Sequence, residues 1–254
     1  MKKLSIIILL SITWPLAAQT EYQAKMHISE SGNLPYRILL PKNFNQNDKY
    51  PLLLFLHGAG ERGSDNKKQL VHGAEHFKSA QSAYPSIVLF PQCPKEDYWS
   101  NLTVDRSEMP YRFQFDYSQP PTPAMSHVMS LLDSLLNQEF VDQDRVYVGG
   151  LSMGGMGTFE ILHRKPETFA AAFAICGAGD PESVSNYAKK TPVWLFHGGK
   201  DNVVLPSYST EMYIALHKAG ARPRYNLYKN ANHNSWDPAF AEDDFISWIF
   251  SQKR

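Results

Sequence analysis

Short apolar runs recur along the chain and have the length of strands. Continuous runs of this kind are typical of strands that are covered on both faces of a sheet. The six runs are "YPLLLFLHG", "SIVLFPQ", "RVYVGG", "FAAAFAICG", "TPVWLFHGG" and "RPRYNLYKN". Ahead of them, "AKMHIS" and "YRILLP" flank the turn sequence "ESGN", a pattern that predicts an antiparallel hairpin. The chain is therefore expected to form an eight-stranded sheet.

Segments with helical spacing separate many of these runs. "TPAMSHVMSLLDSLLNQEF" repeats apolar residues at helical intervals and has Pro123 near its start. "SYSTEMYIALHKAG" ends in Gly220, and "DPAFAEDDFISWIFSQ" predicts a helix capped by Asp237 with Pro238 at its first position. Strands that alternate with helices predict an α/β fold, with a mostly parallel doubly wound sheet and helices on both faces.

In one long segment, at about residues 94–122, the apolar residues follow neither the spacing of a helix nor that of a strand. Structureless loops of this length are usually functional or disordered, but this one is too rich in aromatic residues for a disordered linker. We expect it to be an ordered aromatic flap, inserted over the strand ends. Its aromatic residues are Tyr98, Trp99, Tyr111, Phe113, Phe115 and Tyr117.

The N-terminus has the pattern of a secretory signal peptide. Lys2 and Lys3 precede "LSIIILLSITWPLAA", an apolar run shorter than the ~20 residues of a spanning helix. The sequence predicts a signal peptide over residues 1–18 and a catalytic domain over residues 19–254. The mature protein is expected in the periplasm or outside the cell, without stable insertion in a membrane.

The charge balance limits the kinds of molecule that the protein is expected to bind. The chain has 25 basic and 25 acidic residues, and the basic residues form no stripe. This argues against nucleic acid as a partner. The 43% of hydrophobic residues are enough for one sizeable core.

The strongest chemical motif is "GLSMGG", which directly follows the run "RVYVGG". Gly150, Ser152 and Gly154 spell G-x-S-x-G, the pattern of a serine held on a sharp turn between a strand and a helix. A serine hydroxyl is a poor nucleophile unless a base takes its proton and a third group orients that base. The remaining sequence must supply both.

Candidates for the base and the acid follow later strands, in the order Ser, Asp, His that this sheet requires. His233 in "KNANHNSWD" is the expected base, and Asp201 in "FHGGKDNVV" is the expected acid. Asp180 is a second candidate acid, one strand earlier. His197 is a second candidate base, but it stands at a strand end, where structural histidines are commoner.

Two loops are expected to complete the site. The mechanism needs two N–H donors for the oxyanion, which we assign to the backbone of Met153 and of Ala59 in "HGAGERG". Ligands of such sheets bind outside the carboxyl ends of the strands. Trp99 and Trp236 are therefore predicted to line the substrate cleft, where flat rings suit a sugar or an aryl acid.

Two further motifs predict other chemistry. Gly58, Gly60 and Gly63 match G-x-G-x-x-G, a dinucleotide fingerprint, but the next strand ends in "FPQCP", without the acid that this motif needs. "HGAEH", residues 72–76, matches a zinc protease motif. Gly73 would weaken its helix, and we find no persuasive third ligand. We expect no cofactor and no metal.

Taken together, "LHGAGERGSDN", "PQC" followed by "YWS", "GLSMGG", "HGGKDNVV" and "NHNSWD" resemble the α/β-hydrolase family of predicted peptidases. That family is related to polyhydroxybutyrate depolymerases and to feruloyl and acetylxylan esterases. The similarity covers about residues 21–252. It implies the strand order 1-2-4-3-5-6-7-8, with Ser152 as nucleophile, His233 as base and Asp201 as acid.

The strand order implied by the resemblance also bears on the two cysteines. Two strands would separate those that precede Cys93 and Cys176, and neighbouring strands lie ~4.8 Å apart. This exceeds the reach of a disulfide, so free thiols are expected.

The sequence thus predicts an α/β-hydrolase fold and a secreted serine carboxylesterase. Its expected substrate is a small-molecule or oligosaccharide ester, and the resemblance suggests acetyl or hydroxycinnamoyl esters of plant polysaccharide. The alternatives are a serine peptidase related to prolyl oligopeptidases and a catalytically inactive carbohydrate-binding module on the same scaffold.

Overall fold

The structure is a computed structural model that describes residues 21–29 and 32–254. The predicted signal peptide, residues 1–18, lies outside the described residues. Within the described part of the chain, no helix has both the length and the apolar character needed to cross a membrane.

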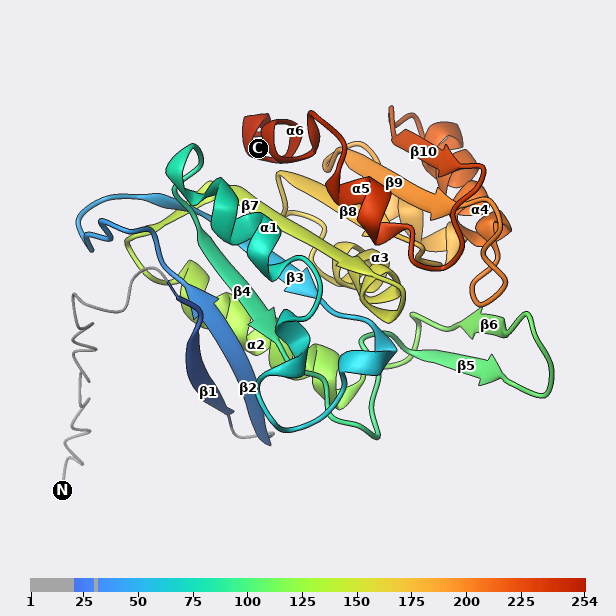
Figure 1. Ribbon diagram of the computed structural model, residues 1–254, viewed down its shortest axis with the longest axis horizontal. Coiled ribbons are helices and arrows are strands. Elements are labelled where there is room, and N and C mark those ends of the chain that lie inside the picture. The colour runs from blue at the N-terminus through green and yellow to red at the C-terminus, as the bar shows by residue number, and fades with distance from the viewer. Residues whose placement is uncertain (1–20, 30–31) are drawn as a thin grey trace, which may run out of the picture.

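An eight-stranded sheet forms the centre of the molecule, in the order β1-β2-β4-β3-β7-β8-β9-β10 (Figure 1). β2 is antiparallel to β1 and to β4, and all other neighbours in this sheet are parallel. The strands are β1 (Gln23–Ser29), β2 (Gly32–Leu39), β3 (Tyr50–Leu56), β4 (Ile87–Pro91), β7 (Val141–Leu151), β8 (Ala171–Ile175), β9 (Val193–Gly198) and β10 (Arg224–Tyr228). The predicted hairpin, the eight strands and their order are confirmed.

Helices cover both faces of the sheet, as predicted. The helices are α1 (Ala74–Ser79), α2 (Pro123–Leu136), α3 (Met153–Arg164), α4 (Pro206–Lys218), α5 (Trp236–Phe240) and α6 (Phe245–Ser251). Successive side chains of a strand point to opposite faces. Leu54 of β3 accordingly packs in a core with residues of α2, α3 and α4, and Phe55 packs in a second core with residues of α1, α5 and α6.

The prediction of the last helix is wrong in detail. Asp237 and Pro238 were expected at its start, but α5 begins at Trp236 and ends at Phe240, and α6 is a separate helix. The interruption has a packing reason. Phe240 and Phe245 both contact Phe77, and their own ring centroids lie 5.7 Å apart. Positions five apart on one helix point in different directions, so the break brings both rings to one core.

Two local predictions are confirmed. Gly220 follows the C-cap residue of α4 with a φ of +88°, the left-handed conformation that glycine adopts readily at helix ends. Cys93 and Cys176 are buried free thiols.

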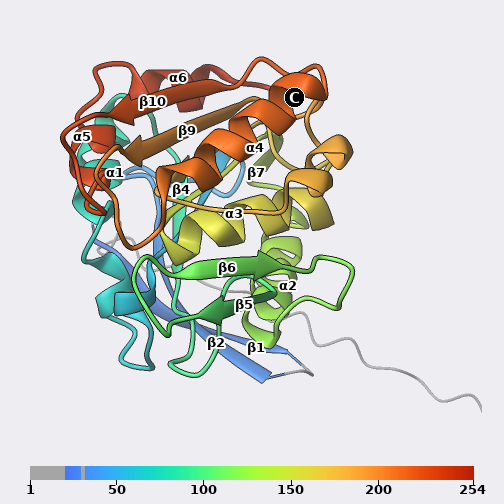
Figure 2. The same ribbon diagram turned by 90° about the vertical axis from the view of Figure 1, so that its right-hand side faces the viewer.

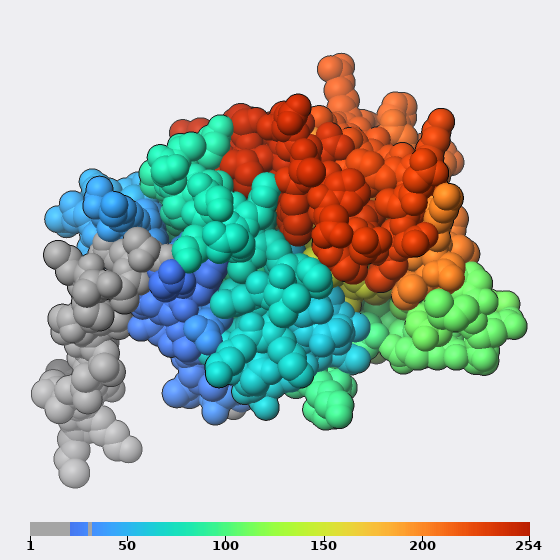
Figure 3. Space-filling view, in the orientation of Figure 1, coloured from blue at the N-terminus to red at the C-terminus, as the bar shows by residue number. Residues whose placement is uncertain are grey.

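The flap is ordered and contains its own hairpin, formed by β5 (Leu102–Asp105) and β6 (Arg112–Phe115). Figure 2 shows this hairpin running past α3. In Figure 3 the flap forms a green lobe that abuts orange residues of the C-terminal half. The Phe113 N–H donates to Tyr208 Oη (3.0 Å), and Phe113 packs in a small apolar cluster with Met156 and Val204. The flap is therefore anchored beside the carboxyl ends of the strands.

Candidate active site

Ser152 occupies a strained turn between β7 and α3. Its φ of 52° lies in the left-handed region, which is costly for a residue with a side chain. The Ser152 N–H donates to the Ile175 carbonyl (2.8 Å) and ties the turn to the end of β8. The turn places the serine directly beyond the carboxyl end of β7.

The two glycines of the motif are required by close backbone approach. A Cβ atom at Gly154 would lie 1.8 Å from the carbonyl oxygen of Leu56, at the end of β3. A Cβ atom at Gly150 would lie 2.5 Å from the same oxygen. The first turn of α3 can therefore lie on β3 only if these positions lack side chains.

We expect Gly154→Ala to destabilise the protein by at least about 3 kcal/mol, because the overlap is with backbone that cannot move aside. Thermal unfolding should show a Tm lower by about 6 to 12 °C. Gly60→Ala is the matched control, since a Cβ there meets no heavy atom of the described residues within 4 Å. We expect its stability to lie within about 0.5 kcal/mol of wild type. A wild-type Tm for Gly154→Ala would show that α3 does not approach β3 this closely.

The structure brings the three predicted residues Ser152, His233 and Asp201 into one hydrogen-bonded chain. The Ser152 hydroxyl lies 2.9 Å from His233 Nε2, and His233 Nδ1 lies 2.7 Å from Asp201 Oδ2. A carboxylate can only accept, so Nδ1 carries a proton and the neutral ring presents Nε2 as the acceptor for the hydroxyl. This is the arrangement in which a histidine can take a proton from a serine.

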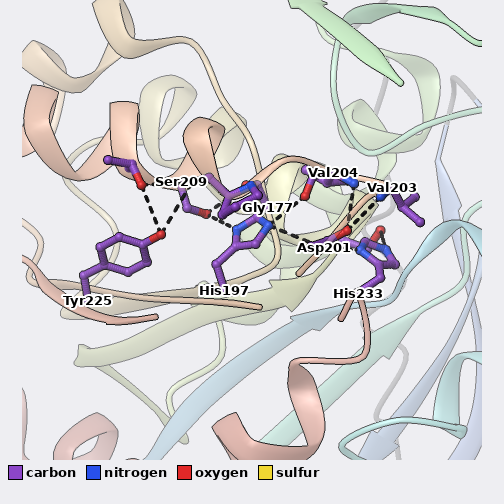
Figure 4. Close-up of polar contacts among 11 residues, drawn as sticks. Gly177, His197, Asp201, Val203, Val204, Ser209, Tyr225 and His233 are labelled. Atoms are coloured by element: carbon purple, nitrogen blue, oxygen red, sulfur yellow. Dashed lines mark hydrogen bonds and ion pairs between the residues drawn. The ribbon is translucent and has the colours of Figure 1, made fainter. Parts of the chain in front are cut away.

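Four donors surround the fully buried Asp201 carboxylate (Figure 4). Oδ1 accepts from the N–H groups of Val203 (2.9 Å) and Val204 (3.0 Å). Oδ2 faces His233 and His197; the His197 Nε2–H lies between Oδ2 (3.2 Å) and the Val204 carbonyl (2.9 Å) and is shared by both. Burial alone would raise the pKa of Asp201, but the hydrogen bonds from His197 and His233 outweigh it and hold the pKa well below its ordinary value. The carboxylate is therefore ionised at neutral pH.

The second candidates for the base and the acid, His197 and Asp180, have other roles in the structure. His197 does not bond to Ser152; it is fully buried, and its Nδ1 contacts Ser209 Oγ (2.7 Å). Its contact with Asp201 makes it a positioning residue. Asp180 caps a 3₁₀ turn by accepting from the Glu182 N–H (2.9 Å).

The two predicted oxyanion donors lie at one pocket of about 190 Å³ that also contains Ser152. Met153 is the first residue of α3, and Ala59 is the first residue of a short 3₁₀ turn. The N–H groups at the start of a helix have no acceptor within it. Both backbone N–H groups are thus free of helical bonds beside Ser152.

Buried His57 holds the loop that contains Ala59. Its Nδ1 donates to the Gly58 carbonyl (2.6 Å), and its Nε2 accepts from the Cys93 N–H (3.0 Å) at the end of β4. Burial lowers the pKa of His57 to about 4, so the ring is neutral at pH 7. This residue shapes the loop.

The prediction that Trp99 lines the substrate cleft is wrong in this structure. Trp99 is 0% exposed, and its Nε1–H donates to the His57 carbonyl (3.1 Å). Its Cβ lies so near α3 that a Cβ atom at Gly157 would be 2.5 Å from it. Trp99 therefore anchors the start of the flap.

Trp236 lies beside the site but outside the 190 Å³ pocket. It is half-buried, and its ring stands edge-on to that of His233, with centroids 5.8 Å apart. The flap supplies the pocket wall instead, through Tyr98, Arg106, Tyr111 and Phe113. Sequence reasoning did not assign these four residues, although the aromatic content of the flap was a signal for three of them.

The two competing motifs do not form their sites. The residues after Gly58 form a 3₁₀ turn, and α1 begins only at Ala74, so no α-helix starts within the glycine motif. His72 faces Glu61 (3.8 Å), and the His76 ring stacks on an aromatic neighbour. Within residues 21–29 and 32–254, the one group of three possible metal ligands is Cys176, Asp201 and His233. The last two of these are already hydrogen-bonded to each other.

A sheet in this order, with a hydrogen-bonded serine, histidine and aspartate beyond its carboxyl edge, defines an α/β hydrolase. Comparison with known proteins narrows this class. The model of the phospholipase/carboxylesterase family matches residues 43–247, and the chain belongs to that family.

Individual relatives agree with this assignment. Lysophospholipase-like protein 1 of Mus musculus is 24% identical, over 71% of this chain and 79% of its own length. The bifunctional acetylxylan esterase/xylanase XynS20E of Neocallimastix patriciarum is 31% identical over 79% of this chain, which spans 28% of that protein. The crystal structure of a thermostable esterase superposes with a TM-score of 0.82 at 35% identity, over 93% of this chain and 64% of that one. The expected resemblance to esterases and the α/β-hydrolase fold are confirmed.

Proposed function

We propose that this protein is a serine carboxylesterase that works through an acyl-enzyme. One observation carries the proposal: Ser152, His233 and Asp201 are joined by two hydrogen bonds of 2.9 and 2.7 Å. The family membership supports ester hydrolysis as the reaction class.

In the proposed reaction, Ser152 Oγ attacks the ester carbonyl carbon as its proton passes to His233 Nε2. The bond to the alcohol oxygen breaks when His233 returns that proton to the leaving group, and the acyl group stays on Ser152. Water then attacks the acyl carbon, again giving its proton to His233, and the acid leaves as Ser152 regains the proton. Asp201 remains ionised and stabilises the imidazolium. The Ala59 and Met153 N–H groups donate to the oxyanion.

We extend the proposal to acetyl or hydroxycinnamoyl esters of plant polysaccharide as substrates, and to export into the periplasm or the medium. The similarity to an acetylxylan esterase/xylanase and the aromatic wall of the pocket support the substrate class. The basic residues and apolar run at the N-terminus support export.

The proposal is tested by comparing esters with amides of the same acyl group. We expect p-nitrophenyl acetate to be cleaved much faster than p-nitroacetanilide, once each rate is divided by that of hydroxide hydrolysis. Feruloylated and acetylated xylan fragments test the substrate class. Faster cleavage of peptidyl p-nitroanilides would favour a peptidase. No labelling of Ser152 by a fluorophosphonate probe would favour a catalytically inactive module.

A further inference from the structure

The pocket that contains Ser152 is positively charged. Its lining includes two charged side chains, Arg62 and Arg106, and none of the described residues that line it is acidic. The whole chain has a formal charge of zero. The charge of this pocket is therefore a local feature beside the reacting serine.

Among residues 21–29 and 32–254, no carboxylate forms an ion pair with either guanidinium. Arg62 donates to two main-chain carbonyls, those of Ala59 (3.1 Å) and Asp97 (3.2 Å). Arg106 donates to the Tyr98 hydroxyl (2.5 Å). By contrast, Arg112 of the same flap pairs with a glutamate at 3.4 Å.

Two acids, Asp97 and Glu61, are sequence neighbours of Tyr98 and Arg62, and neither of them forms an ion pair with Arg62 or Arg106. The Asp97 carboxylate accepts from the Tyr98 N–H (2.7 Å) and from the Ala124 N–H (2.8 Å) at the start of α2. Glu61 Oε1 faces His72 Nε2 at 3.8 Å, and Glu61 Oε2 is buried without a hydrogen-bond partner among the described residues. Neither Asp97 nor Glu61 lines the pocket.

Aromatic rings hold the two arginines in place. The Arg62 guanidinium lies 4.8 Å from the centroid of the Tyr98 ring, and that of Arg106 lies 5.8 Å from Tyr98 and 6.0 Å from Tyr111. A guanidinium has five N–H donors, and the hydrogen bonds described above use two of them in Arg62 and one in Arg106. The remaining donors are available to a ligand.

We propose that Arg62 and Arg106 form an anion subsite beside Ser152, and that the preferred substrates are esters with a carboxylate on the acid or on the alcohol. This inference rests on the proposed esterase function, and among the polysaccharide esters proposed above it selects those whose sugar carries a carboxylate. A guanidinium matches a carboxylate geometrically and electrostatically better than any other side chain does. A neighbouring hollow of about 440 Å³ shares Arg62 and adds Lys68, Lys95 and one acid, Asp65, which lies 3.9 Å from Lys68 Nζ. Basic side chains therefore outnumber acidic ones in this hollow too.

Two matched pairs of esters test the subsite. Mono-4-nitrophenyl adipate and 4-nitrophenyl hexanoate have the same chain length and differ by a carboxylate on the acid. 4-Acetoxybenzoate and 4-acetoxybenzamide differ by a carboxylate on the alcohol. For at least one pair, we expect wild type to favour the charged ester by about tenfold in kcat/KM, after correction for hydroxide hydrolysis. Added salt should lower this preference.

Variants of the flap arginines identify the residue responsible. We expect Arg106→Gln to reduce the preference for the charged ester about tenfold, mainly through a higher KM. Arg106→Lys keeps the positive charge but not the planar pair of N–H donors that can bind both oxygens of a carboxylate. It should retain part of the preference. Arg112→Gln is the matched control, because Arg112 lies on the same hairpin and does not line the pocket. It should keep the wild-type preference.

A direct binding measurement separates the subsite from the proposed reaction. Calorimetry should detect adipate binding to Ser152→Ala, and Arg106→Gln should weaken it. Equal rates within both ester pairs, or a preference unchanged by Arg106→Gln, would overturn the subsite. If wild type hydrolyses none of the four esters, the proposed function fails, and the adipate measurement alone then decides the subsite: binding supports it and no binding overturns it.

Discussion

Ser152→Ala is expected to lower kcat for p-nitrophenyl esters by about 10⁶-fold, the loss seen when a triad that acts as a unit loses its nucleophile. The alanine has no oxygen to form the acyl-enzyme, and His233 then has no hydroxyl to deprotonate. Steady-state kinetics measures the loss. The fold should remain, because within the described residues the Ser152 hydroxyl bonds to His233 and its removal takes away that one contact.

Ser247→Ala is the control for this variant. Ser247 is an exposed serine of α6 whose hydroxyl donates only to a local carbonyl. It should hydrolyse esters at the wild-type rate and react fully with a fluorophosphonate probe, whereas Ser152→Ala should not be labelled. Ester hydrolysis by Ser152→Ala at more than a small fraction of the wild-type rate would refute the role of Ser152.

Asp201→Asn is expected to lower kcat by ~10⁴-fold. The Asp201 carboxylate requires a proton on Nδ1 of His233, which leaves Nε2 free to accept from Ser152. An asparagine amide can instead donate to Nδ1 and favour the opposite tautomer. The N–H groups of Val203 and Val204 at Oδ1 reinforce this effect. They need an acceptor there, so the asparagine oxygen should take Oδ1's place and turn the NH₂ group toward His233.

Asp180→Asn is the matched control, because Asp180 was the second candidate acid and only caps a 3₁₀ turn. Its kcat should stay close to wild type, as an asparagine also caps well. Near-normal activity of Asp201→Asn together with an inactive Asp180→Asn would overturn the assignment of the acid. Circular dichroism and Tm of both variants exclude a loss of fold.

The sequence alone was enough to predict the sheet and the three residues that meet beyond its edge. Buried parallel strands need continuous apolar runs, so their number could be counted from the chain. The carboxyl ends of parallel strands lie at one edge, so Ser152, Asp201 and His233 could be expected to converge. The sharp turn at Ser152 could also be predicted from the sequence. Its glycines, Gly150 and Gly154, occupy positions where backbone contacts leave no room for a Cβ atom.

Only the tertiary structure decided what surrounds these residues. An aromatic ring in a flap can face the substrate or the core, and Trp99 packs under α3, while Tyr98 and Tyr111 line the pocket. The contact of a second histidine with Asp201 could likewise not be predicted from the sequence. The same holds for the two pocket arginines, which have no carboxylate partner in the described part of the chain. Such contacts join segments without a common periodicity, and their partners depend on how the flap and the loops pack. The pattern of apolar runs predicts which strand ends lie together, but side-chain packing decides which side chains remain open to a ligand.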